Sequence, residues 1–356
     1  MIDVFGPVKS LLKIDEVCID NFVFKLHYKA TLCILLGCSI LVTCRQYFGD
    51  AIDCMVDGIP SGIMDTYCWI YSTFTIPDRF DGKEGRTMAH PGVSDFEEGV
   101  DGVKYHKYYQ WVCFVLFFQA MFFYVPRYIW KIWEAGRMKV LVLDLNSPFS
   151  FDSEHRQSLI NYFVHNLHSQ NFYFIRFFLC EILNLCNVFL QIYLIDCFLE
   201  GEFRTYGYDV LKMTELNPED RKDVMSRVFP LVTKCTFNKY GQSGTIQKFD
   251  GMCILPQNNL NEKIYVFLWF WFWFIAIISV LNVVYRILFI LVPHFRLFLL
   301  RSRIDRLSYE NMNILIQKFW IGDWFVFYQL AQNVSPVVFR EFVSELTNKF
   351  ETNVNV

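Results

Sequence analysis

Four long apolar stretches alternate with polar segments along this chain of 356 residues. The stretches cover residues 29–47, 108–128, 172–198 and 264–292. A helix rises 1.5 Å per residue, so about 20 apolar residues in a row span the hydrocarbon of a bilayer. The pattern therefore predicts an all-α membrane protein with four transmembrane helices.

The second stretch gives the clearest signal. Between Tyr108 and Tyr128 the only charged side chain is Arg127. Tyr and Trp gather at both ends of the stretch, and these residues settle where the membrane meets water. The fourth stretch, a run of about 28 apolar residues, opens with alternating Trp and Phe, which favours an aromatic belt on a tilted helix.

The third stretch carries polar residues within about a third of the helix circumference. They are Glu181, Asn184, Asn187 and Gln191. Such a stripe faces protein or water and not lipid. Hydrogen bonds between helices are the favoured interpretation, and the wall of a pore is the alternative.

Basic residues directly after the second and fourth stretches predict that the next segment of chain lies in the cytosol in each case. The cytosolic parts are then an N-terminal segment (1–28), a loop (129–171) with a helical piece at 155–167, and a tail (293–356). Apolar residues at helical spacing near the start also predict a short amphipathic helix within 1–28. Segments 48–107 and 199–263, called here the outer segments, are extracellular, and the plasma membrane is the expected location.

The cysteines agree with this topology. Two of the 12 lie in each outer segment, where disulfides persist: Cys54, Cys68, Cys235 and Cys253. Four cysteines allow three connectivities. We find no paired CxxC spacing, so a zinc site is not expected.

Composition and motifs exclude several classes. The chain is 54% hydrophobic and 19% aromatic, more than a soluble surface hides, and a net charge of −3 without a basic patch argues against nucleic acid. No Walker A loop, GxSxG, GxGxxG or HExxH motif is present, so neither an enzyme nor a cofactor is expected. His165 and His168 have an HxxH spacing without a third ligand, which favours a solvated helix face over a metal site.

Four helices leave little room for a conduit within one chain, and the two halves show no internal repeat. An oligomeric pore or an adhesive scaffold remains. Three acidic residues, Asp50, Asp53 and Asp57, begin the first outer segment. Repeated around a ring they predict a mild cation preference, although subunit contacts or plain solvation are equally good explanations.

Several motifs together resemble the innexins, the invertebrate gap-junction proteins related to pannexins. The signature residues are Tyr108, Tyr109, Gln110, Trp111 and Val112, with Pro126 near the end of the same stretch. The segments 65–70, 261–272 and 321–324 and the two cysteines in each outer segment also match. The likeness covers nearly the whole chain.

The resemblance implies a ring of subunits, an octamer in well-described relatives, that docks with a ring in the next cell and passes ions and small metabolites. It implies disulfides joining Cys54 with Cys253 and Cys68 with Cys235. It also implies that the N-terminal residues form the cytosolic pore mouth: Met1, Ile2, Asp3, Val4 and Phe5. Other innexins are possible partners in a heteromer, membrane lipids surround the ring, and Pro126 is either a gating bend or a fixed kink.

Two further functions stay open. An undocked hemichannel would release small molecules across one membrane, as pannexins do, but the outer segments lack a glycosylation sequon that would keep rings apart. A four-span adhesion protein of the tetraspanin type is the other, but the Cys-Cys-Gly motif of tetraspanins is missing.

Overall fold

The computed structural model describes residues 17–80, 89–95, 101–146, 153–215, 224–302 and 309–352. Helices dominate these residues, as the sequence predicts. The helical elements are α2 (Phe22–Lys25), the π-helical η1 (Leu26–Thr31), α3 (Leu32–Phe48), α4 (Ser61–Tyr71), η2 (Pro77–Arg79), η3 (Tyr108–Gln110), α5 (Val112–Glu134), α6 (Arg137–Asn146), α7 (Ser153–His165), α8 (Asn171–Phe198), α9 (Phe203–Glu215), α10 (Val224–Val228), α11 (Pro256–Leu291), α12 (Pro293–Arg301), α13 (Tyr309–Lys318), α14 (Ile321–Asn333) and α15 (Pro336–Thr352). The strands are β1 (Asp53–Met55), β2 (Thr73–Thr75), β3 (Lys104–His106), β4 (Val232–Tyr240) and β5 (Ile246–Ile254).

Among the described residues, four helices are long and apolar enough to cross a membrane, and each covers most or all of one predicted stretch. They are the continuous helix Phe22–Phe48, made of α2, η1 and α3, and the helices α5, α8 and α11. The helix α5 continues through Pro126 to Glu134. The predicted amphipathic helix at the start of the chain lies mostly outside the described residues, and Val17–Asn21 are not helical.

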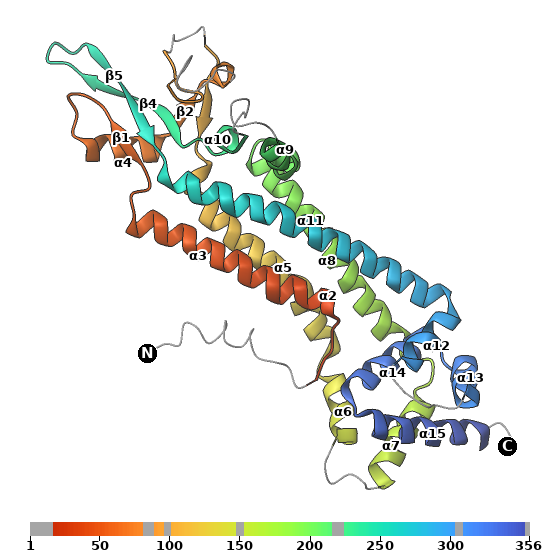
Figure 1. Ribbon diagram of the computed structural model, residues 1–356. Coiled ribbons are helices and arrows are strands. Elements are labelled where there is room, and N and C mark those ends of the chain that lie inside the picture. Colours follow the sequence, from red (N-terminus) through yellow and green to blue (C-terminus); the bar gives the residue numbers. More distant parts are fainter. Residues whose placement is uncertain are drawn as a thin grey trace, which may run out of the picture. The chain divides into compact units, whose positions relative to one another are not determined.

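The chain forms two compact units, and α5, α8 and α11 each contribute to both. The first unit contains residues 1–31, 122–187 and 276–356. Within it, α6, α7 and α12–α15 form a helical domain (Figure 1). Its core is aromatic: Phe327 packs against Phe319, Phe339 and Phe342 with ring centroids 4.9–6.1 Å apart. Burial of such side chains is the main stabilising contribution to a helix cluster of this kind.

The second unit contains residues 32–121 and 188–275. Its main feature is an antiparallel five-stranded sheet in the order β1-β5-β4-β2-β3. The hairpin β4–β5 from the second outer segment lies in the middle, with strands of the first outer segment on both sides (Figure 1). The apolar pattern of these segments predicted no strands. The sheet, α4 and the two disulfides are called here the disulfide module.

Candidate functional sites

The two outer segments are joined by two disulfides. Cys54 on β1 is bonded to Cys253 on β5, and Cys68 on α4 is bonded to Cys235 on β4. These are the pairs that the family resemblance implies. The bonded residues lie 199 and 167 positions apart in the sequence. A cross-link that closes so long a loop removes much of the conformational freedom of the unfolded chain, and typically stabilises by about 2–4 kcal/mol.

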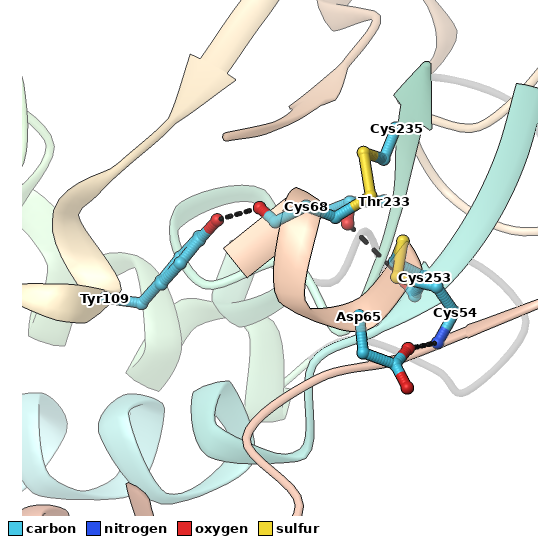
Figure 2. Close-up of a disulfide and its surroundings, with 7 residues drawn as sticks. All are labelled: Cys54, Asp65, Cys68, Tyr109, Thr233, Cys235 and Cys253. Atoms are coloured by element: carbon cyan, nitrogen blue, oxygen red, sulfur yellow. Dashed lines mark hydrogen bonds between the residues drawn. A yellow bond between two sulfur atoms is a disulfide. The ribbon is translucent and has the colours of Figure 1, made fainter. Parts of the chain in front are cut away.

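Hydrogen bonds hold the disulfides in place (Figure 2). The carboxylate of Asp65 accepts from the backbone N–H of Cys54 at 2.7 Å, which ties α4 to β1. The hydroxyl of Thr233 donates to the carbonyl oxygen of Cys253 at 3.4 Å, across β4 and β5. Both disulfides are buried. The two segments therefore form one folded body and not two separate loops.

Sulfur atoms of Cys54, Cys68 and Cys253 lie within 4.8 Å of one another, a spacing that can hold a metal ion. All three atoms are already bonded in disulfides. A disulfide sulfur is not the thiolate that binds zinc. The cluster is therefore structural.

The signature pentapeptide fastens the disulfide module to α5. The hydroxyl of Tyr109 donates to the carbonyl oxygen of Cys68 at 3.3 Å, as Figure 2 shows. The side-chain amide of Gln110 donates to the carbonyl oxygens of Trp69 and, at 3.5 Å, Ile70. These carbonyls lie in the last turn of α4, where a helix has no partners of its own for them.

The other pentapeptide residues have separate roles. Tyr108 packs edge-on against Phe229 with centroids 5.6 Å apart, and Val112 is fully buried. Trp111 is 58% exposed in the single chain, as expected for a residue that faces the membrane interface.

The predicted pore-lining residues fall into two groups. Asp50, Asp53 and Asp57 are all exposed, and Asp53 lies on the edge strand β1. The residues Met1 to Phe5 lie outside the described part of the chain.

Glu181, one of the polar residues of the stripe on α8, is hydrogen-bonded to side chains on α11. The single Nε–H of Arg286 is shared between the two carboxylate oxygens of Glu181, at 2.8 and 3.0 Å, and Asn282 donates a further bond at 3.0 Å. Asn21 also donates to this carboxylate at 2.6 Å. Asn184 and Asn187 are buried in the same unit, and Gln191 is fully buried in the second unit. The favoured interpretation of the stripe is confirmed at Glu181.

The spanning helix predicted over the fourth stretch is confirmed, but the description of that stretch as a run of about 28 apolar residues was wrong at two positions. Asn282 and Arg286 lie within it, one helical turn apart, and Arg286 is 3% exposed. Its guanidinium also lies 5.1 Å from the ring centre of Phe177. The sequence did contain a signal for this site, namely two polar residues spaced i, i+4 within an apolar run. A buried charge in a spanning helix needs a partner on another helix, so Arg286 could have been predicted to form an ion pair.

Comparison with known proteins identifies the family. The innexin family model matches residues 20–350. Innexin inx2 of Schistocerca americana is 58% identical over 354 residues, covering 99% of both chains. Innexin inx2 of Drosophila melanogaster is 58% identical, covering 98% of this chain and 96% of its own. Innexin shaking-B of Drosophila melanogaster is 42% identical, covering 99% and 96%.

The chain belongs to the innexin family. Innexins are multi-pass plasma-membrane proteins that form oligomeric gap-junction channels, and this chain is a channel subunit and not an enzyme. The disulfide module, the pentapeptide and the four spans are therefore parts of one innexin subunit.

The innexin motif at residues 321–324 explains the position of a histidine. His168 does not lie on a solvated helix face as expected, because α7 ends at His165. The ring of His168 instead stacks on Trp320 with centroids 4.3 Å apart. Its backbone N–H donates to the carboxylate of Asp323 at 3.1 Å. Burial raises the pKa of the Asp323 carboxyl, although the backbone N–H groups of Trp320 and His168, which donate to it, oppose the shift.

Proposed function

We propose that this innexin forms a ring of identical subunits, an octamer, and that the ring docks with a second ring in an adjacent cell. In this arrangement the termini, the 129–171 loop and the helical domain lie in the cytosol, and the disulfide module lies outside. The aqueous path passes ions and small metabolites between the two cytoplasms.

The exposed end of the β4–β5 hairpin carries the docking proposal. The nine residue pairs of the hairpin run from Val232 and Ile254 to Tyr240 and Ile246. The neighbouring strands cover only its base, since β1 pairs with residues 252–254 and β2 only with Lys234. A two-stranded ribbon alone in water is marginally stable. A free strand edge also readily pairs with another chain.

The far end of this ribbon has the surface of a contact site. Tyr240 is 74% exposed and Ile246 is 63% exposed. Large apolar side chains placed together on an exposed edge favour a protein partner. We infer that the partner is the disulfide module of a second copy, because both disulfides cross-link the base of the ribbon to the first outer segment and so restrain how its far end is presented.

Paired-cell electrophysiology tests the proposal. The chain is expressed alone in two touching cells, and current is measured between the cells and across each free membrane. We expect junctional current that is lost in Cys54→Ser and Cys253→Ser, while protein still reaches the surface. Current across free membranes without coupling would support an undocked hemichannel instead.

A matched pair of variants separates docking from folding. Tyr240→Ser with Ile246→Ser changes only the exposed end of the ribbon, and we expect it to reduce junctional current while hemichannel current persists. Tyr105→Ser is the control, because Tyr105 is 61% exposed on the edge strand β3 of the same sheet. If the double variant and Tyr105→Ser gave equal junctional currents, docking through the ribbon would be contradicted.

The finer composition of the ring belongs to the same proposal. Coupling by this chain alone would support a homomer. Coupling only after co-expression with another innexin would support a heteromer. Single-particle imaging of the purified ring counts the subunits, and a number other than eight would contradict the octamer.

A further inference from the structure

Four consecutive residues, Cys18 to Asn21, precede the first spanning helix and have no regular secondary structure. They are called here the anchor. The anchor is held from four different helices of the first unit. The density of these contacts is unusual for an irregular segment, because loops generally leave their backbone groups to water.

The helical domain holds the first residue of the anchor. The side-chain oxygen of Asn333, at the end of α14, accepts from the backbone N–H of Cys18 at 2.6 Å. The side-chain nitrogen of the same residue donates to the backbone carbonyl of Cys18 at 2.8 Å. One amide side chain therefore bonds both backbone groups of a residue 315 positions away, as a strand partner would.

The helix α5 holds the next two residues. The indole N–H of Trp130 donates to the carbonyl oxygen of Ile19 at 3.0 Å. The guanidinium of Arg127 forms an ion pair with the carboxylate of Asp20 at 2.8 Å. Asp20 is 2% exposed and Arg127 is 7% exposed, so water screens this pair little.

The last anchor residue joins the network of Glu181. Asn21 begins α2 as its N-cap, since its side-chain oxygen accepts from the N–H of Phe24 at 2.7 Å. Its side-chain nitrogen donates to Glu181 at 2.6 Å and to Asn282 at 3.1 Å. The start of the first span is thereby bonded to α8 and α11.

We propose that the anchor couples the helical domain to the N-terminal end of the first span, with Asn333 and Trp130 as positioning residues. A movement of α14 shifts Cys18 directly, because both backbone groups of Cys18 are bonded to Asn333. Residues 1–17 lead directly into the anchor, so the position of Cys18 sets where that segment ends. This inference rests on the proposed function, in which the N-terminal residues form the pore mouth.

The thiol of Cys18 reports directly on the state of the anchor. It is half-buried, with its sulfur 3.1 Å from the carbonyl oxygen of Asp20 and 3.0 Å from the ammonium of Lys25. The test measures how fast a bulky maleimide labels the full-length protein in permeabilised cells. The rate found for Cys18→Ser is subtracted, so that only labelling of Cys18 remains.

Two variants release the anchor by different routes. Asn333→Ala removes both bonds to Cys18, and Trp130→Phe removes the bond to Ile19 while keeping an aromatic ring. We expect labelling of Cys18 to rise about tenfold in each, the change for a loss of about 1.4 kcal/mol of net hydrogen bonding. Asn348→Ala is the matched control, since it makes the same change at an exposed position on α15.

The same variants are then compared by current. We expect Asn333→Ala and Trp130→Phe to shift the voltage dependence of both free-membrane and junctional currents, and Asn348→Ala to leave it unchanged. If Asn333→Ala does not reach the surface, Asn333→Asp replaces it. That variant keeps the acceptor for the N–H of Cys18 and loses only the donor.

Each result decides the inference. Faster labelling together with shifted voltage dependence supports it. Faster labelling with unchanged voltage dependence overturns the coupling, and unchanged labelling in both variants overturns the anchor itself. A wild-type protein without current in either arrangement contradicts the proposed channel function instead, and the labelling rates still decide the anchor.

Discussion

Gly322 shows how a single residue sets the packing of the helical domain. A Cβ atom at this position would lie 2.4–2.5 Å from backbone atoms of Gln170 and Asn171, and backbone cannot move aside as a side chain can. We expect Gly322→Ala to lower the free energy of unfolding by about 1–3 kcal/mol or more, as overpacking does. Thermal unfolding of the purified protein measures this. Gly62→Ala on α4 is the control, because nothing lies within 4 Å of its Cβ position. If Gly322→Ala melted at the same temperature as the wild type, the packing argument would be contradicted.

His106 makes the disulfide module sensitive to acid. Burial, and the nearby charge of Lys104, lower the pKa of His106 from 6.5 to about 4 in the folded protein. Its Nε2 lies 2.8 Å from the hydroxyl of Thr75. Because the folded state favours the neutral ring, the contribution of His106 to stability is complete above pH 6.5 and is lost as the pH falls toward 4.

We therefore expect the melting temperature of the wild type to fall between pH 6.5 and pH 4 more steeply than that of His106→Asn. The asparagine keeps a polar group near Thr75 and does not titrate in this range. Melting curves recorded along this pH series compare the two proteins. Parallel curves would show that His106 does not titrate with unfolding.

At the scale of elements, the ion pair between α8 and α11 fixes how these helices pack in the first unit. Removing one partner leaves a buried charge without compensation. We expect Glu181→Leu and Arg286→Leu each to reduce the free energy of unfolding by about 3–5 kcal/mol. The double variant should lose clearly less than the sum, because it leaves neither charge behind. Denaturant unfolding of all four proteins completes the cycle.

An exposed ion pair provides the comparison. Arg227 and Glu202 also lie 2.8 Å apart, but both are solvent-accessible. Arg227→Leu should change the free energy of unfolding by no more than about 1 kcal/mol.

The double-variant cycle on α8 and α11 can also contradict the coupling. Additive effects of the Glu181 and Arg286 substitutions would mean that the two side chains act independently.

At the scale of the whole molecule, the acidic start of the first outer segment bears on ion selectivity. Asp50, Asp53 and Asp57 are exposed, so a ring of subunits would repeat their charge around one axis. We expect the triple substitution to Asn to reduce the preference for cations over anions, because the negative potential near the outer pore falls. Reversal potentials in salt gradients measure the preference. An unchanged reversal potential would assign these carboxylates to subunit contacts or to solvent.

The sequence alone determined the four spans, the membrane class and the family. These features depend on the order of residues along the chain, since a run of apolar residues predicts a spanning helix without knowledge of its neighbours. The pentapeptide at 108–112 and the two cysteines in each outer segment are likewise readable from positions in the chain. The cysteine pairs needed the family resemblance, because four cysteines alone leave three connectivities.

Tertiary structure decided the rest, because the decisive contacts join residues far apart in the sequence. Strands β1, β2 and β3 have three residues each, too short for an alternating pattern to reveal them. Only pairing makes them a sheet, since β1 pairs with β5, β2 pairs with β4, and β3 pairs with β2. Glu181 meets Arg286 across 105 positions, and Cys18 meets Asn333 across 315. A side chain's identity shows that it needs a partner when buried, but only the fold brings that partner within hydrogen-bonding distance.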